Sequence, residues 1–212
     1  MRLAYFQKVS LIDYPGKISS VIFTQGCNFR CGFCHNPQLV LPELFEKTIT
    51  KEEIFEYLKR RKGKIEAVVV TGGEPSIHQD LPDLLKEIKE LGYCVKLDTN
   101  GTNPKMLKDI INNKFVDFIA MDIKTVPEKY DDLCGVKVNI NDVIESINII
   151  KNSSIEKQFR ITLVKGYHTK SDLEEIKGLI NSPILLQYFN FTGKHISDLL
   201  SEVNMFKEEE KL

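Results

Sequence analysis

The sequence predicts an α/β fold: an open, partial (β/α)6 barrel in which six parallel strands alternate with helices. Two observations point to it. Short apolar runs rich in β-branched residues recur along the chain, and amphipathic segments with helical periodicity lie between them. This alternation is typical of right-handed βαβ units and a parallel sheet. Because six strands are fewer than the eight of a closed barrel, the barrel is expected to stay open.

Each apolar run is expected to be a strand that is buried on both faces, since helices cover a parallel sheet and its strands carry near-continuous apolar sequence. The runs are of ordinary strand length and are bounded by turn residues. They occupy residues 18–24, 65–71, 93–98, 116–122, 158–164 and 184–189.

Five helices are expected between these strands. The first begins at a capping box, with Thr50 as the N-cap and Glu53 three residues later. The third is expected to begin at the N-cap Asn103, and the fifth at a cap formed by Ser171 with Glu174. Apolar residues at helical spacing mark the five segments at residues 54–58, 81–91, 106–111, 143–150 and 173–180.

Length and composition indicate one domain. A chain of 212 residues, 42% of them hydrophobic, can bury a single sizeable core. No low-complexity linker divides it, so we expect one domain over residues 1–212, with a short N-terminal extension at 1–16 and a C-terminal tail at about 196–212. The 29 basic and 30 acidic residues give a net charge of −1, which leaves no electrostatic footprint for nucleic acid.

The sequence also indicates where the chain works. No apolar run is long enough to span a membrane, and the N-terminal stretch lacks the apolar core of a secretory signal. The five cysteines are an odd number and are too sparse for a disulfide framework. Free cysteines fit a reducing compartment, so we expect a cytoplasmic protein without a membrane partner.

Three of the cysteines form a loop with distinctive spacing: Cys27, Cys31 and Cys34 are arranged as C-x3-C-x2-C directly after the first apolar run. A [4Fe–4S] cluster normally takes four cysteine thiolates. Three cysteines would hold three corners and leave one iron open to a small molecule, much as a catalytic zinc site keeps one position open. The spacing therefore favours a cluster that takes part in chemistry.

A structural zinc site formed by these cysteines with His35 is the main alternative. It is weakened because no second C-x-x-C pair is present and because His35 follows directly on Cys34, which is awkward for tetrahedral closure. The remaining two cysteines are not expected to bind the cluster. Cys94 lies in an expected strand and should pack in the core, and Cys134 lies in a loop without partner ligands at close spacing.

The other distinctive polar residues all follow strands. Because the carboxyl ends of parallel strands meet at one edge of the sheet, and α/β proteins place active sites there, these motifs should converge on one mouth. Asp98 and Asp122 end neighbouring strands, and two nearby carboxylates need a cation, a proton or a ligand. The motifs are Thr-Gly-Gly-Glu-Pro at residues 71–75, Asp-Thr-Asn-Gly at 98–101 and Met-Asp-Ile-Lys at 121–124.

These motifs, the cysteine loop and the segments at residues 9–16 and 21–27 together resemble the radical S-adenosylmethionine (radical SAM) family that activates glycyl-radical enzymes. The resemblance runs from about residue 5 to about residue 195. It is strongest to the longer variety of the activating proteins of anaerobic ribonucleoside-triphosphate reductase, and pyruvate formate-lyase activating enzymes are close relatives. It implies the partial (β/α)6 barrel of the radical SAM type.

The resemblance assigns roles to residues of the mouth. Cys27, Cys31 and Cys34 would ligate a [4Fe–4S] cluster, and Lys124 would meet the methionine carboxylate of S-adenosylmethionine. Phe33 could shield the cluster or stack on adenine, although anchoring its loop to the core explains it equally well. The further cofactor-binding residues implied are Gly72, Gly73 and Glu74 at the methionine amino group, Arg160 facing the cofactor, and Asp98 with Asp122 at a possible monovalent cation.

The implied function is reductive cleavage of S-adenosylmethionine to generate a glycyl radical on anaerobic ribonucleotide reductase, with an electron donor such as flavodoxin or ferredoxin. Phe189 stands where the pyruvate formate-lyase relatives have a histidine, which favours the reductase branch. The alternatives are activation of another glycyl-radical enzyme such as pyruvate formate-lyase, a radical SAM enzyme acting on a small molecule, or a zinc-stabilised binding module. The sequence singles out no catalytic side chain.

Overall fold

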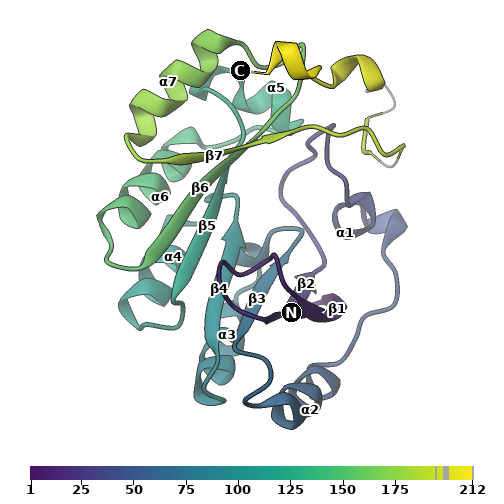
Figure 1. The fold of residues 1–212 in the computed structure, drawn as a ribbon, viewed down its shortest axis with the longest axis vertical. Helices are drawn as coiled ribbons and strands as arrows, with labels where there is room; N and C mark the ends of the chain where they lie inside the picture. The colour runs from purple at the N-terminus through teal and green to yellow at the C-terminus, as the bar shows by residue number, and fades with distance from the viewer. Residues whose placement is uncertain (194, 198–200, 212) are drawn as a thin grey trace.

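One seven-stranded sheet organises the computed structural model, which describes residues 1–193, 195–197 and 201–211 (Figure 1). The six expected strands are present, parallel and adjacent in chain order, which confirms the predicted α/β class. The sheet does not close, because β1 and β7 are its two edges. The strands are β1 (Leu3–Ser10), β2 (Ser19–Thr24), β3 (Ala67–Gly72), β4 (Cys94–Thr99), β5 (Phe118–Ile123), β6 (Glu156–Leu163) and β7 (Ile184–Tyr188).

Strand β1 is an addition to the predicted fold. The sequence predicts only an N-terminal extension at residues 1–16, yet β1 pairs antiparallel with β2, for example at Phe6 and Ile22. Only Leu3, Phe6 and Ser10 of this strand are buried. This edge strand has one partner, and polar residues interrupt its apolar side chains, so it lacks the continuous apolar run by which the other strands were found.

The helices pack mainly against one face of the sheet, and Figure 1 shows α3, α4, α6 and α7 along that side. Each presents an apolar stripe to the large core that fills this layer. No helix in the described part of the chain is long and apolar enough to cross a membrane. The α-helices are α1 (Pro37–Val40), α2 (Lys51–Arg61), α3 (Leu81–Glu90), α4 (Pro104–Asn112), α5 (Tyr130–Cys134), α6 (Ile140–Asn152) and α7 (Lys170–Ile180).

Helix starts follow the capping chemistry in the sequence, with one correction. The Thr50 and Glu53 capping box forms at α2, and the Asn103 side chain accepts from the amide of Met106 at α4. For α7, the predicted cap at Ser171 is wrong. Thr169 has the extended backbone of an N-cap and forms the capping box with Asp172, so Ser171 lies inside the first turn.

The opposite face of the sheet lines the inside of the open barrel. A smaller apolar cluster fills one end of this interior, where Tyr14 is almost fully buried and meets the ring of Phe118 edge-on at 5.8 Å. Because side chains alternate along a strand, the polar residues Lys96, Asp98 and Asp122 share this inner face with Phe118. The interior is therefore apolar at the amino ends of the strands and charged towards their carboxyl ends.

Candidate functional site

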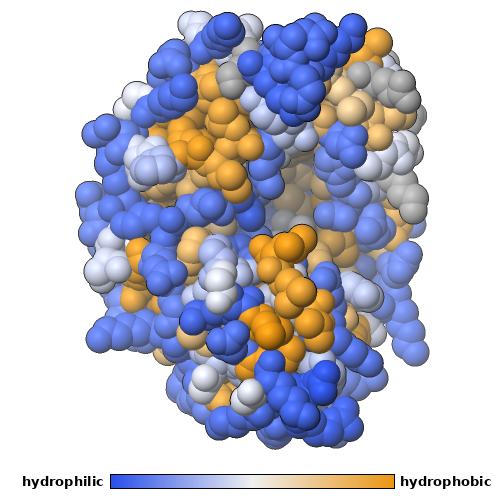
Figure 2. Space-filling view, in the orientation of Figure 1, coloured by the Kyte–Doolittle hydropathy of each residue, from blue (hydrophilic) through white to orange (hydrophobic). Residues whose placement is uncertain are grey.

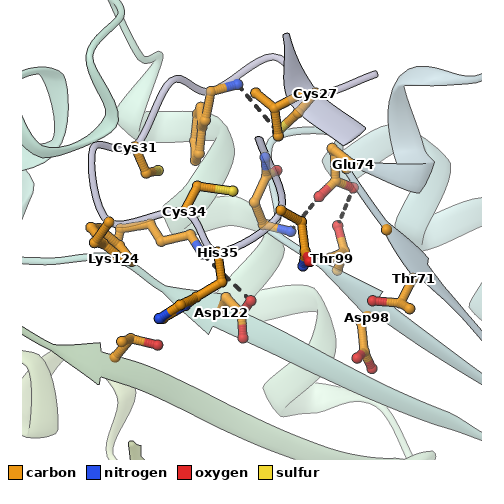
Figure 3. Close-up of a pocket in the computed structure, with 18 residues that line it drawn as sticks. Cys27, Cys31, Cys34, His35, Thr71, Glu74, Asp98, Thr99, Asp122 and Lys124 are labelled. Carbon is orange, nitrogen blue, oxygen red and sulfur yellow. Dashed lines mark hydrogen bonds and ion pairs between the residues drawn. The ribbon is translucent and has the colours of Figure 1, made fainter. Parts of the chain in front are cut away.

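A cavity of about 230 Å3 lies at the carboxyl ends of the strands (Figure 3). The cysteine loop after β2 forms one wall, and the residues that end β3, β4 and β5 form the others. The prediction that four separate motifs converge on one mouth is therefore confirmed.

All three cysteines of the loop line this cavity. The loop is held in shape by its own backbone, since the amide of Cys34 donates to the carbonyl of Cys31 at 3.0 Å and the amide of Phe29 donates to the sulfur of Cys27 at 3.4 Å. The amide of Arg30 donates to the carbonyl of Cys134 at 2.7 Å, which ties the loop to α5. Three thiols thus face one space from a braced segment.

The three thiols of the loop differ in how readily they ionise. Burial raises the pKa of Cys27 to about 12 and also raises that of Cys34. Cys31 behaves differently, because the Cys134 thiol donates a hydrogen bond to its sulfur and lowers its pKa. Thiolates are the ligands of iron–sulfur clusters, so a cluster bound here would displace protons from Cys27 and Cys34. Three soft donors on one wall of a cavity fit such a cluster.

Cys134 is a neighbour that the sequence analysis missed. It was expected to lack partner ligands, but it is fully buried against Cys31. More than a hundred residues separate the two cysteines, so no local spacing could have revealed the pair.

His35 does not join the thiols. Its Nε2–H donates to the carbonyl of Asn190 at 2.7 Å, and its ring lies 5.5 Å from the ring of Phe189. The imidazole is thereby directed towards the segment after β7, which weakens the zinc alternative. Phe33, by contrast, is buried in the main core and also lines the cavity, so its anchoring role and its contact with a ligand are compatible.

The glycine turn after β3 is packed tightly against the cysteine loop. The amide of Gly73 donates to the carbonyl of Thr24 at 2.9 Å, and the amide of Glu74 donates to the carbonyl of Gly26 at 2.8 Å. Gly72 adopts φ +127°, and a Cβ on Gly73 would overlap the carbonyl of Gly26. The turn and the cysteine loop therefore form one unit, in which only glycine fits at both positions.

Glu74 connects this turn to the motif after β4. Its buried carboxylate accepts from the Ser76 amide at 3.0 Å and hydroxyl at 2.6 Å, from the Thr99 hydroxyl at 2.7 Å and from the Asn100 amide at 2.6 Å. Burial raises the pKa of Glu74, although these donors oppose the shift. All of these hydrogen bonds to the Glu74 carboxylate come from the protein itself, so Glu74 shapes this wall of the cavity.

The predicted charged residues come together on the inner face of the sheet. Arg160 on β6 bridges the carboxylates of Asp98 and Asp122, at 3.2 and 2.8 Å. Lys124 lies 3.4 Å from Asp122, and its ammonium is 6.0 Å from the centre of the Phe33 ring. Burial opposes ionisation of Asp122, but Lys124 and Arg160 hold its pKa below the usual value. Lys124 also lines the cavity, and its side chain is 18% exposed.

Lys96 is a further charge that the sequence analysis missed. Its Nζ donates to Asp98 at 2.6 Å, and the residue is only 3% exposed. A signal was available, because residues two apart in a strand point to the same face, which places Lys96 beside Asp98.

His168 supports the backbone beneath Lys124. Its Nδ1 accepts from the amide of Val164 at 3.0 Å, and its Nε2–H donates to the carbonyl of Lys124 at 2.8 Å. This arrangement needs the neutral imidazole, and burial accordingly lowers the pKa of His168.

The His168→Gln variant should lose stability less steeply in acid than the wild type. Because the folded pKa lies below the unfolded value of about 6.5, the unfolded chain takes up the proton first. The contribution of His168 is therefore complete above about pH 6.5 and is lost as the pH falls. Melting temperatures of both proteins at neutral and mildly acidic pH measure this loss of stability. An equal fall in melting temperature in the variant and the wild type would contradict the role of His168.

Comparison with known proteins agrees with this site. The model of the radical SAM superfamily matches residues 21–180. A protein of Methanocaldococcus jannaschii assigned as a glycyl-radical enzyme activating enzyme is 33% identical over 196 residues, covering 90% of this chain and 80% of the relative. The pyruvate formate-lyase-activating enzyme of Clostridium pasteurianum is 32% identical over 203 residues, covering 79% and 82%.

The structural comparison supports the fold. Streptococcus suis SuiB bound to S-adenosylmethionine matches with a TM-score of 0.66 at 18% identity, over 86% of this chain and 43% of that one. The [4Fe–4S] cluster and S-adenosylmethionine are the cofactors of the superfamily, and the three thiols of the cavity fit such a cluster. The chain belongs to the radical SAM superfamily and, within it, to the family of glycyl-radical enzyme activating enzymes.

Proposed function

We propose that this chain, acting as a single domain in the cytoplasm, generates a glycyl radical on anaerobic ribonucleotide reductase. The observation that carries the proposal is the shared cavity. Three cysteine thiols, the glycine turn and Lys124 line it together, so a cluster and S-adenosylmethionine can be held in contact. The relatives support activation of a glycyl-radical enzyme, and the choice of reductase rests on the resemblance of the sequence.

When bound, the cluster and S-adenosylmethionine would supply the chemistry. One electron from a donor such as flavodoxin or ferredoxin would cleave the sulfonium to methionine and a 5′-deoxyadenosyl radical, and this radical would take a hydrogen atom from the partner's glycine Cα. The protein holds and orients the reactants. Cys27, Cys31 and Cys34 provide the thiolates, and Lys124 offers an ammonium to the methionine carboxylate. Phe33 lines the cavity, where its ring would shield the cluster or stack on the adenine.

One face of the molecule offers an apolar surface to a protein partner. Figure 2 shows apolar side chains gathered over β1 and the loop that follows it, and the same face is hollowed between this patch and the C-terminal segment. The large apolar residues exposed in this region are Tyr5, Val9, Leu11 and Ile12. Contiguous exposed apolar surface commonly marks an interaction site, and an open barrel gives a protein loop access to its interior.

Electron paramagnetic resonance after anaerobic incubation tests the partner. Reconstituted protein, a reductant and S-adenosylmethionine are mixed with anaerobic ribonucleotide reductase or with pyruvate formate-lyase. We expect a glycyl radical on the reductase and none on a reductase whose acceptor glycine is replaced by alanine. A radical on pyruvate formate-lyase alone would overturn the choice of partner. Conversion of a small molecule, with no radical on either protein, would overturn activation altogether.

Lys124→Ala should weaken S-adenosylmethionine binding while leaving the fold intact. One charge-assisted contact to a carboxylate is worth roughly 1.5–3 kcal/mol, so the affinity should fall about ten- to a hundredfold. Equilibrium binding to the reconstituted protein measures the change. Lys137→Ala is a matched control, because that lysine also pairs with an aspartate but its side chain is 94% exposed and outside the cavity. Equal affinities in the two variants would contradict the role of Lys124.

A further inference from the structure

The two carboxylates expected to hold a monovalent cation are already engaged by side-chain cations. Asp98 accepts from Lys96 at 2.6 Å through Oδ1 and from Arg160 at 3.2 Å through Oδ2. Asp122 accepts from Arg160 at 2.8 Å through Oδ1 and from Lys124 at 3.4 Å through Oδ2. Each of the four carboxylate oxygens therefore has a cationic donor, and the residues do not fit an additional metal ion.

The balance of charge leads to the same conclusion. Two carboxylates face three positive side chains, Lys96, Arg160 and Lys124, so the group carries a net charge of +1. A sodium or potassium ion would raise the net charge to +2 in a partly buried site, where like charges repel more strongly than in water. An anionic group, such as the methionine carboxylate of S-adenosylmethionine, would instead neutralise it.

Within this group, the ammonium of Lys96 is buried and held beside a carboxylate, as a bound metal cation would be. Its side chain is only 4% exposed, and its ammonium lies between the Asp98 carboxylate and the ring of Phe118, whose centre is 5.8 Å away. Asp98 also lines the cofactor cavity. Lys96 does not line the cavity and contacts Asp98 from the interior of the barrel. A lysine ammonium is a compact point charge, so it can supply what a monovalent cation supplies to a carboxylate.

We propose that the ammonium of Lys96 takes the place of a metal cation at Asp98, so that the cofactor site works without sodium or potassium. Lys96 is a positioning residue: it orients the Asp98 carboxylate and, through it, Arg160 and Asp122. The inference rests on the use of S-adenosylmethionine in the proposed function and does not depend on which protein receives the radical.

The experiment measures S-adenosylmethionine affinity in reconstituted protein, with potassium chloride exchanged for choline chloride at constant ionic strength. Wild-type affinity should stay constant. Lys96→Met, which keeps the length of the side chain but removes its charge, should lose about tenfold or more in choline and regain affinity in potassium. Lys89→Met is the matched control, because Lys89 pairs with Asp117 at 2.7 Å, near the amino end of β5, and its loss should create no response to potassium.

A second readout does not use the cofactors. Potassium should raise the melting temperature of Lys96→Met without raising that of the wild type or of Lys89→Met. The carboxylate that loses its lysine is largely shielded from water only in Lys96→Met, since the Asp98 side chain is 13% exposed and the Asp117 side chain is 35% exposed. A potassium response in the wild type would overturn the inference, and this outcome requires no variant to fold. A Lys96→Met protein that binds normally, or whose loss potassium does not restore, would overturn it as well. No partner protein is present, so failure here is distinct from failure of the proposed activation.

Discussion

Cys27→Ala is expected to abolish cleavage of S-adenosylmethionine. Cys27 is one of three thiols that line the cavity, and its loss would leave two protein ligands for a cluster that needs three of its irons held. Wild-type protein reconstituted without oxygen should contain about four irons per chain, and its reduced spectrum by electron paramagnetic resonance should change when S-adenosylmethionine is added. Both properties should be lost in the variant.

Cys94→Ala is the control for this experiment. Cys94 begins β4 and packs beside the small apolar cluster at the other end of the barrel interior, away from the cavity. The variant should keep its iron and its response to S-adenosylmethionine. Zinc in place of iron in the wild type, or a spectrum that the cofactor leaves unaltered, would refute the cluster assignment.

Gly73→Ala should have the second largest effect. The added Cβ would overlap the carbonyl oxygen of Gly26, the group that accepts from the amide of Glu74. The added Cβ and the carbonyl of Gly26 are both attached to backbone, so neither can move without shifting the main chain. Overpacking of this kind typically costs about 1–3 kcal/mol of stability or more. S-adenosylmethionine affinity should fall by about a hundredfold, together with a lower melting temperature.

Gly178→Ala provides the opposite case. Gly178 lies within α7, and a Cβ there would meet nothing within 4 Å. Alanine is favoured over glycine in a helix by about 1 kcal/mol, so this variant should be more stable than the wild type and bind the cofactor equally well. Normal binding by Gly73→Ala would show that the turn does not need to pack so closely against the cysteine loop.

The sequence predicted the central strands well because burial on both faces leaves a continuous apolar signature, as in Val68, Val69 and Val70. It missed β1 because polar residues interrupt that strand, whereas the other edge strand, β7, begins with a short apolar run and was predicted. It also misplaced the start of α7, where two overlapping capping patterns compete and only backbone geometry selects Thr169 over Ser171.

For the functional site, too, some features could be predicted from the sequence and others could not. Parallel topology alone brought the strand-end motifs together, so Asp98, Asp122 and Lys124 could be placed in one mouth before their contacts were known. Contacts between distant segments could not be foreseen, and the thiol of Cys134 beside Cys31 is the clearest example. The possible cation came from resemblance, and the position of Lys96 in the structure argues against it.

Transfer of a hydrogen atom from the partner tests the central claim most directly. The glycyl-radical partner is prepared with deuterium at its glycine Cα and incubated without oxygen with this protein, a reductant and S-adenosylmethionine. Mass spectrometry of the product should find deuterium in 5′-deoxyadenosine, with about one product molecule per radical if coupling is tight. Deuterium-free 5′-deoxyadenosine, formed at the same rate with and without the partner, would contradict the account.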